Sequence, residues 1–176
     1  NIVLIDEINR APAKTQAALF EVMEERQITI DGSQYALEAP FMVLATQNPV
    51  EQEGTYPLPE AQLDRFMFMV KVDYPNADEE REILRRTTGG EGEQIRGILD
   101  GEVLHELQAA VREVPVADTV YDYVLALTRS SRLGDESALD FIQQYVTWGA
   151  GPRASQFLIL GAKAHAALQG RNHVST

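Results

Sequence analysis

The chain has 176 residues, of which 44% are hydrophobic and 24% charged, and it contains no cysteine. This composition is typical of a globular protein and excludes disulfide frameworks, cysteine-ligated metal sites and thiol nucleophiles. The net charge of -12 disfavours nucleic acid as a partner, and no apolar run predicts membrane insertion or a signal segment, so we expect a cytoplasmic protein.

Aliphatic residues dominate positions 1–5 without alternation, and Asp6 and Glu7 follow directly. Such a run predicts a central parallel strand that is covered on both faces. A central strand needs neighbours, and residue 1 is not methionine. We therefore expect the chain to be part of a longer protein.

The next segments alternate between helix and strand patterns. Apolar residues at helical spacing predict a helix that begins near Pro12 and ends near Arg26. Two short β-prone runs around an Asp-Gly pair predict a hairpin over residues 28–37. Three further elements are predicted: a strand at 41–45, a short helix around 63–66 and a strand at 67–72.

Beyond Pro75 the strand patterns stop and helical patterns dominate. Asn76 and Glu79 have the spacing of a capping box, which predicts the start of a helix. Further helices are predicted at 100–113, 118–131, 136–147 and 152–168. We therefore expect two domains, an α/β domain at 1–75 and a helical domain at 76–176.

Two adjacent carboxylates, Asp6 and Glu7, follow the first predicted strand, at the end of the strand where open α/β sheets bind ligands. In a phosphate-hydrolysing site, Asp6 can hold Mg²⁺ through water and Glu7 can polarise the attacking water as a general base. Taken alone, the pair is better explained as an acidic entry to a helix.

Asn48 follows the strand predicted at 41–45 and precedes Pro49. Its neutral amide can donate to a phosphate and orient the same water, although an Asn-Pro pair by itself is an ordinary turn. One helix and one hairpin separate the two strands, so both strand ends are predicted to lie at one edge of the sheet. We expect Asp6, Glu7 and Asn48 to converge there on one polar patch.

Two arginines are further candidates. Arg65 either pairs with its neighbour Asp64, which residue type alone favours, or reaches a phosphate across a subunit boundary. Arg153 lies in the first turn of the last predicted helix, where the helix dipole disfavours a cation. This position suggests an anionic ligand, while a surface arginine is the commoner explanation.

Five strings, in this order and spacing, resemble the MoxR family of AAA+ ATPases: N-I-V-L-I-D-E-I-N-R-A, E-V-M-E-E-R-Q-I-T-I-D-G, A-T-Q-N-P, L-P-E-A-Q-L-D-R-F and G-P-R-A-S-Q. The resemblance covers nearly the whole chain. It implies an α/β fold, a partial AAA+ P-loop NTPase core with a parallel sheet, flanking helices and a β-hairpin insert, followed by an all-α lid domain.

The resemblance also implies a role for each candidate residue. Asp6 and Glu7 match the Walker B pair, with Asp6 on Mg²⁺ through water and Glu7 as the catalytic base. Asn48 matches sensor 1, which positions the attacking water. Arg65 matches the arginine finger, which acts on ATP bound by the adjacent subunit, and Arg153 matches sensor 2 at the start of a lid helix.

The chain departs from the family pattern in two places. Gly151 stands where the family usually has Ser, and the phosphate-binding string G-x-x-x-x-G-K-[ST] is absent from the sequence. We therefore expect the chain alone to be inactive. We also expect its sheet to lack the strand between 41–45 and 67–72, which leaves edges exposed or paired with another copy.

For the full-length protein, the resemblance implies an ATPase that uses ATP and Mg²⁺ at the subunit interfaces of a ring, a homo-hexamer. Hydrolysis would drive chaperone-like remodelling or maturation of partner proteins, often alongside proteins with von Willebrand A-type domains. Two alternatives stay open, a non-catalytic AAA+-like interaction module and a magnesium-chelatase-like ATPase subunit.

Overall fold

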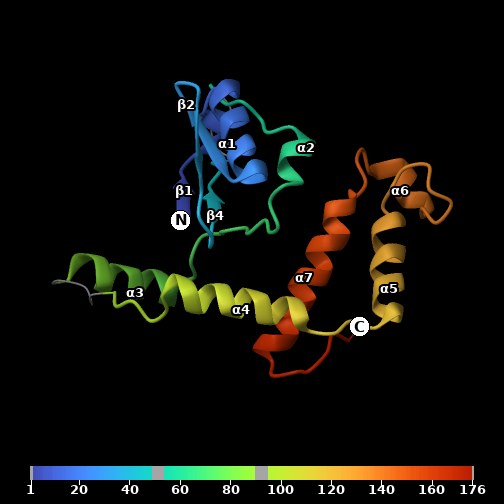
Figure 1. Ribbon diagram of the computed structural model, residues 1–176. Coiled ribbons are helices and arrows are strands. Elements are labelled where there is room, and N and C mark those ends of the chain that lie inside the picture. Colours follow the sequence, from blue (N-terminus) through green and yellow to red (C-terminus); the bar gives the residue numbers. More distant parts are fainter. Residues whose placement is uncertain (1, 49–53, 90–94, 176) are drawn as a thin grey trace. The chain divides into compact units, whose positions relative to one another are not determined.

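The computed structural model of the protein describes residues 2–48, 54–89 and 95–175 (Figure 1). These residues divide into two compact units, one made of 1–67 with 101–176 and the other of 68–100. In chain order the elements are β1 (Ile2–Ile5), η1 (Ile8–Arg10), α1 (Ala13–Glu25), β2 (Gln27–Ile30), β3 (Ser33–Ala36), β4 (Met42–Ala45), α2 (Glu60–Leu63), α3 (Ala77–Thr88), α4 (Gly101–Glu113), α5 (Asp118–Arg129), α6 (Asp140–Tyr145) and α7 (Pro152–Leu168).

Strands β1 and β4 pair in parallel, in a register that runs from Ile2 opposite Met42 to Ile5 opposite Ala45. This confirms that the two strands are neighbours and that their C-terminal ends meet at one edge. In the described chain β4 is the only strand partner of β1 and Leu4 is 67% exposed, so the central, doubly covered position of β1 in the longer protein stays a prediction. Both outer edges of this pair are open within the described residues, as expected.

A small apolar core lies beneath the inner face of this sheet. Ile8, Phe20 and Leu58 are buried together, and Ile5 and Ala45 from the ends of the two strands pack against them. Phe20 reaches this core because α1 presents one apolar side, and burying such a ring stabilises the fold by roughly 2–3 kcal/mol. The predicted helix after Pro12 is thus confirmed, and it anchors the sheet edge where the candidate residues lie.

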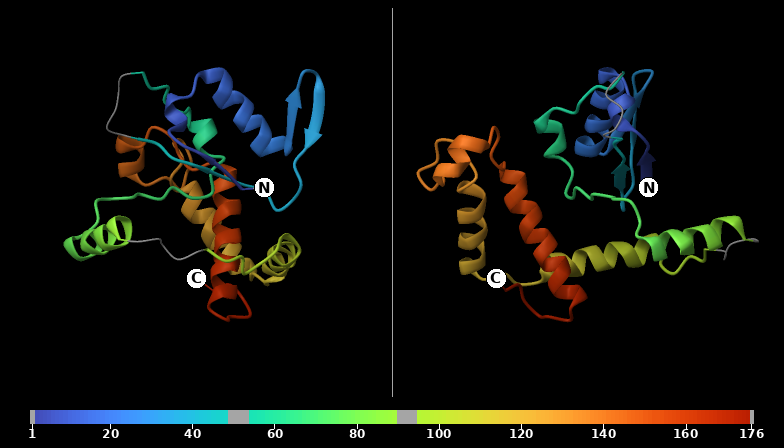
Figure 2. Two further views of the ribbon diagram at one scale, coloured as in Figure 1. Left: turned by 90° about the vertical axis from the view of Figure 1, so that its left-hand side faces the viewer. Right: turned by 180° about the vertical axis from the view of Figure 1, so that it is seen from behind.

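The predicted hairpin is confirmed as β2 and β3, which pair antiparallel directly after α1 (Figure 2, left view). Asp31 and Gly32 form its two-residue turn, with φ angles of 49° and 80°. Both angles are positive, which is the requirement of a type I′ turn and explains the Asp-Gly pair.

The strand predicted at 67–72 is wrong. Residues 68–72 carry no strand and pair with no strand of the described chain. An apolar segment becomes a strand only when its backbone N–H and C=O groups find a ladder partner. The side chains of this segment are accordingly exposed, with Val70 at 79% and Val72 at 90%.

Helix α3 follows in the same unit and begins as predicted. The side chain of Asn76 accepts hydrogen bonds from the N–H groups of Asp78 and Glu79, both at 3.0 Å. The Glu79 carboxylate accepts from the N–H of Asn76 at 2.9 Å, which completes a capping box. Local sequence therefore sets this helix start.

The C-terminal helices have an apolar core of their own. Helix α7 packs against α4 and α5, and Val120, Ala166 and Val174 are buried between them. A parallel bridge between Val116 and Val174 ties the end of the chain to the segment before α5. Helix α6 is shorter than predicted. No helix in the described ranges has the length and hydropathy to cross a membrane.

Candidate functional site

The three candidates at the sheet edge converge, as the parallel pairing predicts. The Asn48 amide Nδ2 donates to Glu7 Oε1 at 3.4 Å. Between the strand ends lies Thr46, whose hydroxyl donates to Asp6 Oδ1 at 2.5 Å and accepts from the N–H of Glu7 at 2.9 Å. Asp6, Glu7, Thr46 and Asn48 together form what we call the strand-end patch. Thr46 was not predicted as a site residue. It is the first polar residue after the apolar strand and lies two residues before Asn48, and this position could have identified it from the sequence.

Glu7 has a left-handed backbone conformation, with φ 49° and ψ 52°. A non-glycine residue adopts this region rarely and at a cost of about 1 kcal/mol or more, so the surroundings must hold it there. Thr46 does so, because its carbonyl accepts from the N–H of Ile8 at 3.0 Å and its hydroxyl accepts from the N–H of Glu7. Strain of this kind occurs preferentially at functional sites.

The Glu7 carboxylate is held from two directions. One oxygen faces Asn48, and the other, Oε2, lies 3.0 Å from Nε of Arg10. Arg10 was not among the residues predicted for the site. Its spacing of three residues from Glu7, at the short helix η1, brings the two side chains together. Because both carboxylate oxygens have a partner, the Glu7 side chain is held in one orientation within the strand-end patch.

Gln16 supports the loop behind the patch. Its side chain is buried, at 3% exposure, and its amide donates to the carbonyls of Ile8 at 3.2 Å and Tyr56 at 3.0 Å. The N–H of Tyr56 donates in turn to the carbonyl of Asn9, and the Asn9 side chain donates to the carbonyl of Asn48 at 3.2 Å. Gln16 was also not predicted. It is a polar residue four positions before Phe20, on the buried side of α1, and this position could have identified it from the sequence.

The two candidate arginines share one partner, Glu24, which takes no part in these contacts. Arg65 Nη2 lies 2.7 Å from Glu24 Oε2, and Arg153 Nη2 lies 2.9 Å from Glu24 Oε1. The expected ion pair of Arg65 with Asp64 is wrong, because α1 brings Glu24 to the guanidinium. Arg65 also donates to the carbonyl of Phe20 at 3.0 Å and lies over its ring at 5.7 Å. The side chain of Arg153 is 37% exposed and pairs with Glu24, which agrees with a surface arginine, and an anionic ligand for it stays a prediction.

Asp64 has a different neighbour, the N-terminus of α7. A Cβ atom on Gly151, the N-cap of α7, would lie 3.2 Å from Asp64 Oδ2. A carboxylate at this end of a helix interacts favourably with the helix dipole. The absence of a side chain at Gly151 therefore gives the Asp64 carboxylate room beside the first turn that carries Arg153.

Within the described ranges, no group of three or more His, Asp or Glu side chains forms a metal cage. Asp6 is exposed, and one of its oxygens is already oriented by Thr46. Magnesium in nucleotide sites is held by one or two carboxylates, with water and phosphate oxygens as the other ligands. The residues present fit a hydrated Mg²⁺ that arrives with a nucleotide.

Two family models match the chain. Residues 1–68 match the model of the ATPase family associated with various cellular activities (AAA), and residues 140–176 match that of the AAA lid domain. The first match contains the strand-end patch and Arg65, and the second contains Arg153. Neither model covers residue 75, so the domain boundary there stays a prediction.

Curated relatives match nearly the whole chain. Chaperone MoxR1 of Mycobacterium tuberculosis is 44% identical over 174 residues, which are 99% of this chain and 46% of that protein. Protein MoxR of Paracoccus denitrificans is 31% identical over 184 residues, which are 98% of this chain and 54% of that protein. The chain therefore spans about half the length of the curated relatives it matches.

The fold also matches a solved structure. The crystal structure of a candidate ATPase from Cytophaga hutchinsonii superposes with a TM-score of 0.92 at 41% sequence identity. The match covers 99% of this chain and 53% of that chain. At this identity the similarity extends to the sequence as well as the fold.

Proposed function

Because this chain belongs to the MoxR family of AAA+ ATPases, we propose that the whole protein hydrolyses ATP at the strand-end patch. The observation that carries the proposal is the convergence of two carboxylates, a hydroxyl and an amide where β1 and β4 end. Hydrolysis of a terminal phosphate requires an oriented water, a base for its proton and a cation for the phosphate charge. The patch has a residue suited to each of these needs.

Glu7 is the base in this proposal. Its carboxylate accepts the proton that the attacking water loses, and Asn48 and Arg10 hold that carboxylate in one orientation. The Asn48 amide faces the same space and orients the water, a task for which a second carboxylate would be repelled by phosphate. Correct orientation lowers the barrier because the water does not have to find its geometry during the reaction.

Asp6 is the residue that would hold Mg²⁺, through water. Bound with the nucleotide, Mg²⁺ would neutralise charge on the phosphate oxygens. Thr46 holds the Asp6 carboxylate toward the patch, and the exposure of Asp6 leaves room for a hydration shell. The phosphate-binding loop that would hold most of the triphosphate is expected in the part of the protein upstream of this chain.

We further propose that the protein acts in the cytoplasm as a ring, a homo-hexamer. Arg65 would stabilise the transition state on ATP bound by the neighbouring subunit, and Arg153 would contact the phosphates within its own subunit. Such an arginine supplied in trans accelerates hydrolysis by about 10³ or more in other nucleotidases. Support comes from the L-D-R-F and G-P-R strings and from the match to the lid model.

A chaperone-like role in the remodelling or maturation of other proteins follows in the same proposal. Its support is the similarity to a relative that is named a chaperone, MoxR1. Proteins with von Willebrand A-type domains are the partners that we propose to test first. The strand-end patch does not itself specify a protein substrate, so this part depends on the relationship alone.

The test uses the full-length protein, including the upstream part. We expect Glu7→Gln to keep ATP binding and to lower the turnover number by at least about 10²-fold, because the carboxamide cannot take the proton. Glu25→Gln is the matched control, since Glu25 carries no ion pair within the described residues. A wild-type protein that assembles a ring but turns over no ATP would contradict the proposal and support the non-catalytic module.

A further inference from the structure

Glu24, near the C-terminal end of α1, joins the two arginines that the proposed function assigns to phosphate. Each of its carboxylate oxygens binds one guanidinium, Oε2 that of Arg65 and Oε1 that of Arg153. Glu24 and Arg153 are 129 residues apart in the chain, so the contact depends on packing and not on local sequence. While this contact holds, the Arg153 guanidinium already has an anionic partner.

The two arginines that bind Glu24 are held unequally. Arg65 is the more buried, with its side chain 27% exposed, and it is bound additionally by the carbonyl and the ring of Phe20. Arg153 is 37% exposed and lies in the first turn of α7, where the helix dipole disfavours its charge. Arg153 is therefore the arginine that separates more readily from Glu24.

We propose that Glu24 is a positioning residue that competes with nucleotide phosphate for Arg153. Arg65 fixes the Glu24 carboxylate, and the carboxylate holds Arg153 until a phosphate replaces it. A phosphate oxygen is a strong partner for a guanidinium because it accepts charge-assisted, bidentate hydrogen bonds. This inference rests on the proposed function, and it adds a resting contact that nucleotide binding must break.

Competition of this kind predicts the direction in which the affinity for ATP changes. Removing the charge of Glu24 frees Arg153, so Glu24→Gln should bind ATP more tightly than the wild type. A partly exposed ion pair is modest in strength, and we expect the dissociation constant to fall about two- to fivefold. Salt screens the pair in the wild type, so the difference between the two proteins should shrink at high ionic strength.

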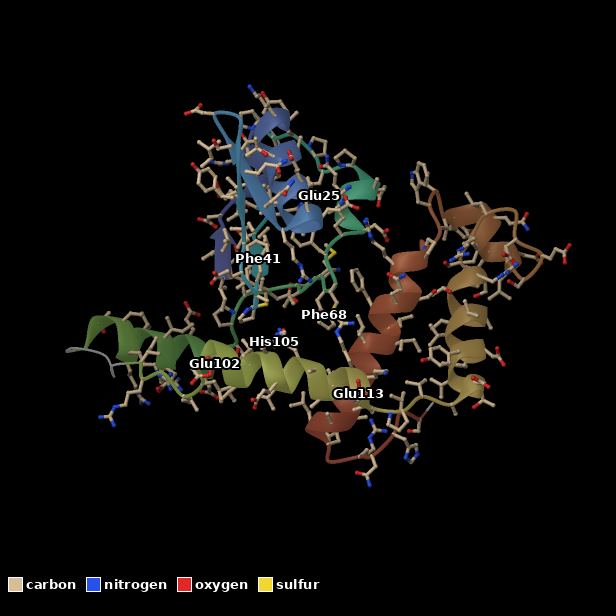
Figure 3. All side chains as sticks on the ribbon, in the orientation of Figure 1. Glu25, Phe41, Phe68, Glu102, His105 and Glu113 are labelled. Atoms are coloured by element: carbon tan, nitrogen blue, oxygen red, sulfur yellow. The ribbon has the colours of Figure 1, made fainter. Side chains whose placement is uncertain are left out.

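The experiment measures the dissociation constant of a fluorescent, slowly hydrolysed ATP analogue on the full-length protein at low and high salt. The variants are Glu24→Gln, Arg153→Ala and the double variant, with Glu25→Gln as the control on the same helix; Glu25 is labelled in Figure 3. We expect tighter binding for Glu24→Gln alone, and the same constant for the double variant as for Arg153→Ala. Thermal unfolding of each variant confirms that it is folded.

The outcomes separate this inference from the proposed function. Unchanged or weaker binding by a folded Glu24→Gln variant, in a protein that still hydrolyses ATP, overturns the inference alone. The inference also fails if Glu24→Gln tightens binding equally when Arg153 is already alanine, because the effect would then bypass that arginine. A wild type that binds no ATP overturns the proposed function itself, and the competition with it.

Discussion

The hydroxyl of Thr46 donates a 2.5 Å hydrogen bond to the carboxylate of Asp6. The same oxygen accepts from the N–H of Glu7, so one side chain at the end of β4 orients both acidic residues at the end of β1. A hydroxyl is suited to this position because it carries a donor and an acceptor on one atom. The parallel register of β1 and β4 brings the three residues together.

We expect Thr46→Val to raise the magnesium concentration that ATP turnover requires. Valine keeps the shape of the side chain but can neither donate to Asp6 nor accept from the N–H of Glu7. The magnesium concentration that gives half-maximal ATP turnover should rise about tenfold, which corresponds to about 1.4 kcal/mol. Thr46→Ser keeps the hydroxyl and should behave nearly as the wild type. Equal magnesium dependence in all three proteins would show that the hydroxyl has no such role.

Two substitutions of Asn48 should separate its role in orienting the attacking water from the effect of its neutral charge. Asn48→Ala removes the amide that faces Glu7 Oε1, and we expect the turnover number to fall about 10²-fold because the water is less well oriented. Asn48→Asp should fall further, since a third carboxylate beside Asp6 and Glu7 repels both them and phosphate. Single-turnover kinetics measure the chemical step directly. Similar rates for Asn48→Asp and the wild type would contradict the role of the neutral amide.

Gly149, in the segment before α7, is a position where the backbone itself needs the space. A Cβ atom there would overlap the carbonyl of Ser131 and the backbone of Arg132. We expect Gly149→Ala to destabilise the protein by about 1–3 kcal/mol, measured by chemical denaturation. The control is Gly97→Ala, where an added Cβ meets nothing within 4 Å. Equal stability of Gly149→Ala and the wild type would contradict the close packing.

Asp135 should titrate below its ordinary value. The hydroxyl and the N–H of Ser137, followed by the charge of Arg129, lower the pKa of this carboxyl group from 3.8. Because the folded-state pKa is depressed, its contribution to stability is complete above pH 3.8 and is lost as the pH falls through the folded value. NMR titration should show a midpoint below 3.8 that rises toward it in Ser137→Ala. A midpoint at or above 3.8 in the wild type would contradict these contacts.

The elements that the sequence predicted well are those decided by close neighbours in the chain. The capping box at Asn76 and the Asp31–Gly32 turn need only residues within a few positions, and both form as expected. The segment at 67–72 is equally apolar but needs a ladder partner from elsewhere, and the described chain supplies none. Apolar character alone therefore did not decide whether a strand forms.

For the candidate site, the sequence by itself determined the convergence of Asp6, Glu7 and Asn48, because parallel strands end at the same edge. Only the tertiary structure decided that Thr46 and Arg10 hold the acidic pair and that Glu24 binds both Arg65 and Arg153. The physical reason is range. Strand and turn patterns express local backbone preferences, whereas a carboxylate chooses among several cations according to which of them packing brings within about 4 Å.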